Sequence, residues 1–241
     1  MALLEVRSLG KSFRGLRAVA EVSFDVEAGS IAALIGPNGA GKTTCFNLIA
    51  GVYPADNGSV ALAGRTLTGL RPDQVCRAGV ARTFQVVKPF AQLTVTENVV
   101  VGALNTLRDV AAARAEAARV LALVHLEAKA HQPAASLTLP ERKLLEVARA
   151  IATRPRILLL DEVMAGLRPT EVDEMVEVFR RLNRDSGLTI LLIEHVMRAV
   201  MALAERVVVL HHGEKICEGA PEDVVRDPQV LECYLGSETL D

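Results

Sequence analysis

Residues Gly36 to Thr43 read Gly-Pro-Asn-Gly-Ala-Gly-Lys-Thr, which matches the phosphate-binding motif G-x-x-x-x-G-K-[ST] at every fixed position. In this motif the glycines let the backbone curl, so that successive N–H groups point at phosphate oxygens. Lys42 supplies a positive charge for the β- and γ-phosphates, and the Thr43 hydroxyl can bind Mg²⁺. The residues expected to bind a nucleotide such as ATP are Gly36, Pro37, Asn38, Gly39, Ala40, Gly41, Lys42, Thr43 and Thr44.

The residues on either side of the motif fit its usual place between a strand and a helix. The apolar run Ile31 to Ile35 precedes it, as a buried strand should, and Thr44 to Ala50 is predicted to form a helix capped by Gly51. A helix that begins at the loop directs the positive end of its dipole at the bound anion. The alternative, a glycine turn that matches by chance, explains neither neighbour.

Composition places the chain among globular proteins. Half of its 241 residues are apolar and 23 % are charged, which is enough to build a sizeable core. The net charge is −2, and no run of lysine and arginine occurs. We therefore expect no nucleic-acid partner, although a local basic patch is compatible with a neutral total.

The cysteines and the apolar runs bear on location. The four cysteines are far apart and include no C-x-x-C pair, which is typical of reduced thiols in a cytosolic protein. Met1 to Gly10 already contains Glu5 and Arg7, so no signal peptide is predicted. No uncharged apolar run approaches the roughly 18 residues that span a bilayer. Any membrane role is therefore expected to depend on other chains.

Strands alternate with helices along the sequence. The first thirty residues contain short apolar runs broken by glycines, and together with Gly58 to Gly64 they predict antiparallel strands. Beyond them the pattern predicts helices over 109–126, 141–153 and 170–186, strands over 157–160 and 189–193, and a hairpin of 207–210 with 215–217. This order predicts an α/β fold with a mainly parallel sheet and helices on both faces.

Two carboxylates end one of the predicted buried strands. Asp161 and Glu162 follow the apolar run that begins at Ile157, and ligands bind at this edge of an open α/β sheet. Asp161 can hold Mg²⁺ directly or through water, and Glu162 can polarise the water that attacks a γ-phosphate. An ordinary polar strand end is the alternative, and the phosphate motif disfavours it.

Two further residues allow more than one interpretation. His195 follows the predicted strand 189–193 and can reach the same γ-phosphate, but a lone histidine is more often structural. Phe13 is one of eight aromatic residues (six phenylalanines and two tyrosines) and lies in a glycine-flanked turn. It can belong to the core or stack on a base, and composition alone does not decide between them.

The order of these motifs resembles that of an ABC-transporter nucleotide-binding subunit, and the resemblance covers essentially the whole chain. The resemblance rests on the phosphate loop, Gln85, the segment 137–150, Leu160-Asp161-Glu162 and Glu194-His195. Finer features are similar to the ATP-binding subunits of branched-chain amino-acid importers. These features are Ala81-Arg-Thr-Phe-Gln85, Leu93-Thr-Val-Thr-Glu-Asn98, Ala165-Gly-Leu-Arg-Pro169 and Val230-Leu-Glu-Cys-Tyr-Leu-Gly236.

The resemblance assigns roles and partners. It implies that Phe13 stacks on adenine with Val19 packing nearby, and that Gln85 senses Mg²⁺ and the attacking water. It implies that Glu162 is the catalytic glutamate and that His195 contacts the γ-phosphate. Mg²⁺ is then expected at Thr43, Gln85 and Asp161. The expected partners are membrane permease subunits, a second ATP-binding subunit in a head-to-tail dimer and, indirectly, a solute-binding protein. The expected location is the cytoplasmic face of the cell membrane.

The sequence departs from the family at its signature. The usual Leu-Ser-Gly-Gly-Gln is replaced by Leu137-Thr-Leu-Pro-Glu141. Thr138 keeps a hydroxyl for the phosphate of the other subunit, whereas Pro140 removes a backbone donor and Glu141 adds negative charge. Thr138 and Glu141 also have the spacing of a capping box, which predicts a helix start. Two readings stay open: an importer ATPase with a weaker contact, which we favour, or one that hydrolyses poorly without its partners.

We expect residues 1–241 to form a single ABC domain. Its core, with the antiparallel layer, is expected in 1–85 and 155–241, and a helical signature subdomain in about 86–154. An ABC ATPase of another transporter, for urea, amides or another small solute, is the alternative. A nucleic-acid or ribosome-associated ABC ATPase would need tandem cassettes or basic arms, which are not visible. A small-molecule kinase would leave Gln85 and His195 unexplained.

Overall fold

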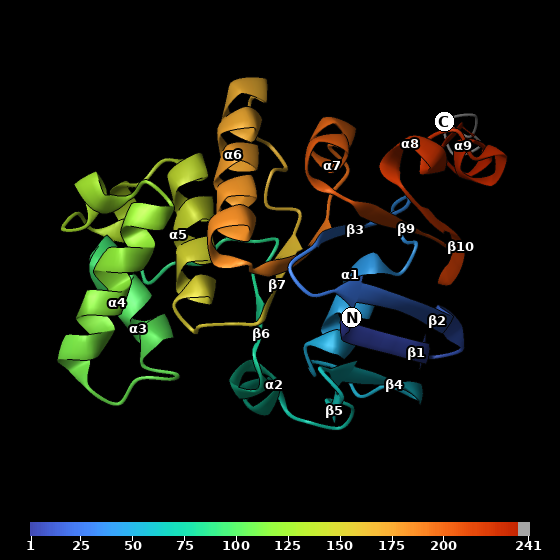
Figure 1. The fold of residues 1–241 in the computed structure, drawn as a ribbon, viewed down its shortest axis with the longest axis horizontal. Coiled ribbons are helices and arrows are strands. Elements are labelled where there is room, and N and C mark those ends of the chain that lie inside the picture. Colours follow the sequence, from blue (N-terminus) through green and yellow to red (C-terminus); the bar gives the residue numbers. More distant parts are fainter. Residues whose placement is uncertain (236–241) are drawn as a thin grey trace.

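The computed structural model describes residues 1–235, and the last residues of the predicted domain, 236–241, lie outside the described part. Two sheets organise the molecule (Figure 1). The larger sheet has the order β10 (Glu214–Gly219), β9 (Arg206–His211), β3 (Ile31–Ile35), β8 (Thr189–Ile193), β7 (Ile157–Asp161) and β6 (Val80–Arg82). Strands β9 to β6 pair in parallel and β10 pairs antiparallel with β9. The predicted mainly parallel sheet is therefore confirmed.

Continuous apolar sequence explains the centre of this sheet. Every residue of β3, β7 and β8 is buried, as expected for parallel strands that are covered on both faces. At the sheet edge, β9 and β10 form the predicted hairpin. Its two-residue turn, His212 and Gly213, has positive φ at both positions, which matches the twist of a tight hairpin.

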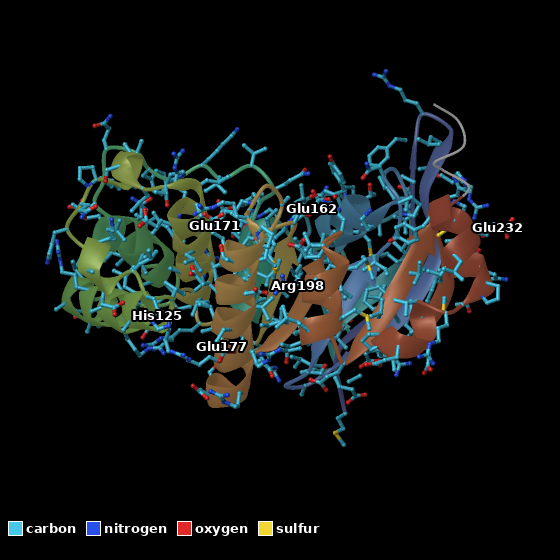
Figure 2. The ribbon with its side chains drawn as sticks, turned by 90° about the horizontal axis from the view of Figure 1, so that it is seen from above. His125, Glu162, Glu171, Glu177, Arg198 and Glu232 are labelled. Atoms are coloured by element: carbon cyan, nitrogen blue, oxygen red, sulfur yellow. The ribbon has the colours of Figure 1, made fainter. Side chains whose placement is uncertain are left out.

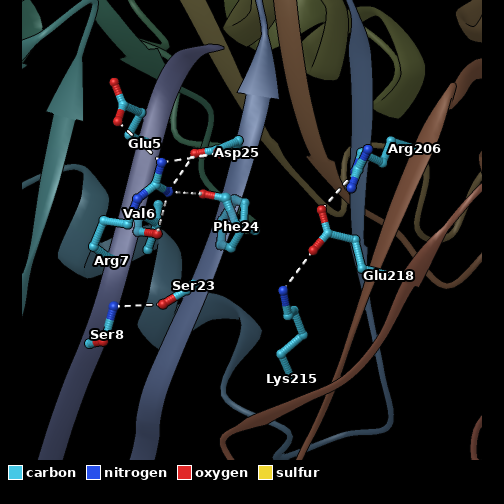
Figure 3. Close-up of polar contacts among 10 residues, drawn as sticks. All are labelled: Glu5, Val6, Arg7, Ser8, Ser23, Phe24, Asp25, Arg206, Lys215 and Glu218. Atoms are coloured by element: carbon cyan, nitrogen blue, oxygen red, sulfur yellow. Dashed lines mark hydrogen bonds and ion pairs between the residues drawn. The ribbon is translucent and has the colours of Figure 1, made fainter.

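The smaller sheet is antiparallel, as predicted, and lies beside α1 (Figure 1). Its order is β2 (Leu16–Glu27), β1 (Ala2–Phe13), β4 (Asn57–Leu62) and β5 (Arg65–Thr66). Its exposed face carries ion pairs: Arg7 of β1 contacts Asp25 on the neighbouring strand β2 and Glu5 on its own strand (Figure 3). Figure 3 also shows Arg206 and Lys215 meeting at Glu218 on the β9–β10 hairpin. Such exposed pairs contribute little to stability, roughly 0–1 kcal/mol each.

The two faces of the large sheet belong to two separate cores. Ile31, Ala33 and Ile35 pack against helices, whereas Ala32 and Leu34 pack against α1 (Lys42–Ile49) and the antiparallel sheet. The alternation follows from the two-residue period of a strand. The predicted helices on both faces are confirmed, and on one face α1 and Val75 of α2 (Pro72–Ala78) share the core with the strands of the antiparallel sheet. Those strands already present an apolar side, so few helices are needed there.

The remaining helices are α2 (Pro72–Ala78), α3 (Val95–Ala103), α4 (Val110–Leu123), α5 (Leu139–Ile151), α6 (Pro169–Ser186), α7 (Met197–Leu203), α8 (Pro221–Val224) and α9 (Pro228–Leu235), with short 3₁₀ turns at Glu127–Lys129 and Ala134–Ser136. Of these, α4, α5 and α6 lie where periodicity predicts helices. Helices α3, α4 and α5 gather at one end of the molecule (Figure 1) and pack on one another. Within residues 1–235, no helix combines the length and the apolar character that a bilayer crossing requires.

Helix α5 begins with the predicted capping box. Thr138 is its N-cap, and its backbone N–H donates to Glu141 Oε2 over 2.8 Å. The other oxygen, Glu141 Oε1, lies 3.4 Å from Lys129 Nζ. The backbone hydrogen bond from Thr138 is the main cause that lowers the pKa of Glu141. The proline and the glutamate of the variant signature thus serve as the start of a helix.

The close contact between α3 and α5 can be tested by a substitution at Gly102. A Cβ added at Gly102 would lie 2.3 Å from the carbonyl oxygen of Arg149 on α5. We expect Gly102→Ala to lower the free energy of unfolding by about 1–3 kcal/mol, because overpacking outweighs the better helix propensity of alanine. Gly219→Ala is the matched control, since its Cβ would meet Val224 at an ordinary 3.7 Å. Equal denaturant midpoints for the two variants would contradict this packing.

Candidate functional site

The site forms where four parallel strands end at one edge of the large sheet. Asp161 at the end of β7 pairs with Ile193 at the end of β8, and Leu34 of β3 pairs with the same Ile193. Arg82 ends β6 beside Leu159. Because these carboxyl ends are in register, the segments that follow them meet. They are the phosphate loop, the turn at Glu162, the segment Glu194-His195 and the loop of Gln85.

Close backbone approach explains the glycines of the phosphate loop. A Cβ at Gly36 would lie 2.1 Å from the carbonyl oxygen of Leu210 on β9, and one at Gly41 would lie 2.3 Å from that of Ala18 on β2. Both glycines also have positive φ. The loop is therefore wedged between the two sheets, in a conformation that side chains at these positions would prevent.

Lys42 is held inside this loop. Its Nζ donates to the carbonyl oxygens of Gly36 (2.7 Å) and Pro37 (2.9 Å), and the residue is only 6 % exposed. Burial lowers the pKa of Lys42, while the charges of Glu162 and Asp161 oppose that shift. The ammonium group thus lies at the mouth of the loop, where an anion would replace its carbonyl partners.

A cleft of about 540 Å³ opens over the loop, a size typical of ligand sites. Its lining includes residues 38–44 of the loop and brings in side chains far away in the sequence: Phe13, Leu16, Arg17, Ala18, Gln85, Glu162 and His212. Phe13 is 37 % exposed and packs edge-on against Tyr53, with 5.3 Å between the ring centroids. One side of its ring is therefore held and the other faces the cleft.

Val19, predicted to pack near the adenine, is not among the residues that line the cleft. Val19 is only 2 % exposed and belongs to the core beneath the antiparallel sheet. The residue that lines the cleft is its neighbour Ala18. Successive side chains of a strand point to opposite faces, so Ala18 lies on the side of the cleft and Val19 on the side of the core.

Glu162 occupies the centre of the site. Figure 2 shows it near the middle of the molecule, between the helical end and the sheets. Gln85 Nε2 donates to Glu162 Oε2 over 2.6 Å, and His195 Nε2 lies 3.4 Å from the same oxygen. Glu162 is 8 % exposed and has a φ of +51°. The structure therefore brings Gln85, Glu162 and His195 together, although they come from three separate segments.

Asp161 lies one residue earlier and is almost fully buried. Its Oδ2 accepts a hydrogen bond from Arg82 Nη2 over 2.7 Å, whereas its Oδ1 has no partner. Burial raises the pKa of Asp161, and the ion pair with Arg82 opposes the rise. A buried carboxylate oxygen without a partner fits a hydrated Mg²⁺ nearby, since such oxygens are costly unless paired.

Comparison with known proteins places this arrangement in a family. A family model described as ABC transporter matches residues 19–165. The chain belongs to the ABC transporter family. A second model, described as branched-chain amino acid ATP-binding cassette transporter, matches residues 214–239.

Individual relatives of this ABC cassette match it from end to end. The high-affinity branched-chain amino acid transport ATP-binding protein BraF of Pseudomonas aeruginosa is 39 % identical, over 97 % of this chain and 98 % of BraF. The lipopolysaccharide export system ATP-binding protein LptB of Acidithiobacillus ferridurans is 37 % identical over 98 % of each chain. A crystal structure of the ADP conformation of an ATP-binding cassette of an ABC transporter has a TM-score of 0.89 at 29 % identity, over 98 % of this chain and 99 % of that one. The predicted fold class and family are confirmed.

One predicted site residue of the cassette lies apart from the others. Thr138 is exposed at the start of α5 and does not line the cleft. Pro140 behind it takes its place in the first turn of the helix. None of the described residues that line this cleft therefore belongs to the variant signature, 137–141.

Sequence reasoning assigned no role to several charged residues of the ABC cassette that the fold buries. Arg82 pairs with Asp161, and Lys143, Glu146 and Glu194 are 5 %, 7 % and 1 % exposed. Lys143 and Glu146 fall on the buried side of α5, among its apolar residues, and a check of helix periodicity for charges would have found them. Burial raises the pKa of Glu194 to about 7.

The raised pKa of Glu194 makes stability depend on pH. The folded cassette keeps a proton that the unfolded chain releases, so the free energy of unfolding falls as the pH rises from about 4.5 to 7, by about 3 kcal/mol at most. Glu194→Gln removes this loss. We expect the variant to gain stability over the parent at pH 8 and to gain little at pH 5, in denaturant unfolding. Glu174→Gln, on the exposed side of α6, is the control. A gain of equal size at both pH values would refute the assignment.

Proposed function

We propose that this chain is the ATP-hydrolysing subunit of an importer that takes up branched-chain amino acids through separate permease subunits. The observation that carries the proposal is the cleft that joins the phosphate loop to Gln85 and Glu162. Similarity to BraF and the match of the carboxyl-terminal model support the class of solute. Similarity to LptB, a lipopolysaccharide export protein, makes another transported solute the alternative.

The site residues divide the chemistry among them. The phosphate loop and Lys42 bind the β- and γ-phosphates, and Phe13 stacks on the adenine across the cleft. Glu162 accepts a proton from the attacking water, which its buried carboxylate can hold in line with the γ-phosphorus. Gln85, bonded to Glu162, orients the same water, and His195 contacts the γ-phosphate.

Mg²⁺ fits this donor set only together with phosphate oxygens. Among residues 1–235, no group of three or more His, Cys, Asp or Glu side chains could hold a metal ion. The residues that would hold it are Thr43, Gln85 and Asp161, the last through water at its unpartnered Oδ1. Bound there, the ion would neutralise charge on the β- and γ-phosphates.

A second ATP-binding subunit completes the site. The N-terminus of α5 and the Thr138 hydroxyl are exposed and carry no contact to the chain's own loop. In a head-to-tail pair they would face the ATP of the other subunit, with the helix dipole directed at phosphate. The partner is a related cassette or a second copy of this chain.

Permease subunits would dock where the helical end meets the core. A groove of about 280 Å³ there has Val52, Phe84 and Val101 among its lining residues, and these three side chains are 44 %, 59 % and 43 % exposed. Residues 86–154 would act as a helical subdomain next to the core of 1–85 and 155–241. The subunit would then lie on the cytoplasmic face of the membrane, and a solute-binding protein would act on the other side.

Glu162→Gln tests the hydrolytic role. The amide cannot take the proton of the water, so we expect ATP turnover to fall at least about 100-fold while ATP still binds. The assay is phosphate release by the full chain with its permease subunits in vesicles, together with ATP-driven uptake of leucine against urea. Glu177→Gln, on the exposed side of α6, is the matched control. Unchanged turnover would remove Glu162 from the mechanism, and uptake of urea alone would reassign the solute.

Glu141→Gln tests the variant signature. The amide oxygen can still accept from the Thr138 N–H, but the negative charge at the start of α5 is lost. We expect ATP-dependent dimers to form at about two- to fivefold lower ATP concentration. This factor corresponds to the free-energy effect of one charge near a helix terminus. Light scattering in the Glu162→Gln background measures this. An unchanged midpoint would mean that Glu141 serves only as a cap.

A further inference from the structure

Helix α5 carries three charged side chains at intervals of three residues on its inner side: Lys143, Glu146 and Arg149. Lys143 is 5 % exposed and Glu146 is 7 % exposed. Residues of this kind are almost never buried without partners, and a packed apolar side chain would cover the same surface at less cost. Their contacts therefore need an explanation beyond packing.

Lys143 holds the turn that follows β7. Its Nζ donates to the carbonyl oxygen of Ala165 over 2.7 Å and lies 3.4 Å from that of Glu162. Glu162 has the left-handed φ of +51°, a conformation that costs energy for a residue other than glycine and persists only where the surroundings fix it. Lys143 helps to hold this conformation, because it contacts backbone carbonyl groups of the turn.

Glu146 and Arg149 hold the loop that carries Gln85. Glu146 Oε1 accepts a hydrogen bond from the Phe84 N–H over 2.7 Å. Arg149 donates to the carbonyl oxygen of Lys88 over 3.2 Å and lies over the Phe90 ring, 4.7 Å from its centroid. Glu146 and Arg149, which follow Lys143 along α5, therefore hold a second loop on the other side of the site.

The two loops that α5 holds meet each other at the reacting centre. The Gln85 side chain donates to Glu162 over 2.6 Å, and the anchors of these two residues lie three positions apart on one helix. The spacing of Gln85 and Glu162 is therefore set by a rigid element rather than by two independent loops.

We propose that Lys143 and Glu146 are positioning residues, which hold the Gln85 and Glu162 loops on α5 so that the two side chains share one water. The inference rests on the proposed function of Glu162. It also links the variant signature to the site. Thr138 is the N-cap of α5, so a rotation of α5 caused by a contact at Thr138 would move both loops. Arg149, which donates to the Lys88 carbonyl oxygen, helps to hold the Gln85 loop.

The turn after β7 is held from its other side as well. Glu194 Oε1 accepts a hydrogen bond from the Met164 N–H over 2.8 Å. Because this hydrogen bond involves no residue of α5, loss of the Lys143 contact should shift the turn without unfolding it. Variants at Lys143 are therefore expected to fold.

Turnover kinetics separate positioning from nucleotide binding. We expect Lys143→Met and Glu146→Leu each to lower kcat about tenfold with KM for ATP unchanged, since Phe13 and the phosphate loop are untouched. Lys143→Arg, which keeps the donors, and Glu146→Gln, which keeps the acceptor, should recover most of the loss. Lys215→Met, on the β9–β10 hairpin, is the control. The full chain with its permease subunits is assayed, beside Glu162→Gln.

Amide hydrogen exchange gives a second readout that needs no turnover. In Glu146→Leu the Phe84 amide loses its acceptor and should exchange at least about tenfold faster, whereas Glu146→Gln should retain its protection. Lys143→Met should raise exchange in residues 162–167. Unfolding midpoints confirm that each variant is folded.

The outcomes distinguish this inference from the proposed function. If Glu162→Gln stops hydrolysis but Lys143→Met and Glu146→Leu leave both kcat and exchange unchanged, the positioning role is wrong and the hydrolytic role stands. A rise in KM with kcat constant would also overturn it, because that pattern indicates altered binding. If Glu162→Gln hydrolyses normally, the proposed function fails first.

Discussion

The register of the parallel strands is the constraint on which the site depends. β3, β8 and β7 end at the same level, because Leu34 and Asp161 both pair with Ile193. Each strand is buried along its whole length, so a slip of one residue would turn apolar side chains toward the wrong core. The positions of the phosphate loop, Glu162 and His195 follow from that packing, and the polar chemistry begins where the apolar runs stop.

Charges buried behind this edge then organise the loops. Arg82 neutralises Asp161 on one side, while Lys143 and Glu146 hold the backbone of the loops on the other. Buried ionic groups add little net stability, because their desolvation offsets their attraction. Their effect here is directional: they fix backbone groups of Glu162 and of Phe84, the neighbour of Gln85, so that Glu162 and Gln85 both line the cleft.

Much of the fold was predictable because it repeats with a local period. The apolar runs 31–35, 157–160 and 189–193 predicted buried strands, and the helices predicted over 109–126 and 170–186 correspond to α4 and α6. The motifs located the cleft for the same reason, since the phosphate loop and Glu162 each follow such a strand directly. Val19 was named from the family resemblance alone, and the alternation of side chains along β2 places Ala18 rather than Val19 in the lining of the cleft. The contacts of Lys143 with Ala165 and of Glu146 with Phe84 span 22 and 62 residues, and no local pattern encodes their partners.

The variant signature illustrates how a cap can replace a glycine motif. Pro140 removes a donor only in the first turn of α5, where no intrahelical acceptor exists for it. The free N–H groups at this terminus still carry the positive end of the helix dipole. Glu141 is drawn back by Thr138 and Lys129, so its charge is partly neutralised before any phosphate arrives. The change from the usual signature therefore leaves intact the helix that holds Gln85 and Glu162 together.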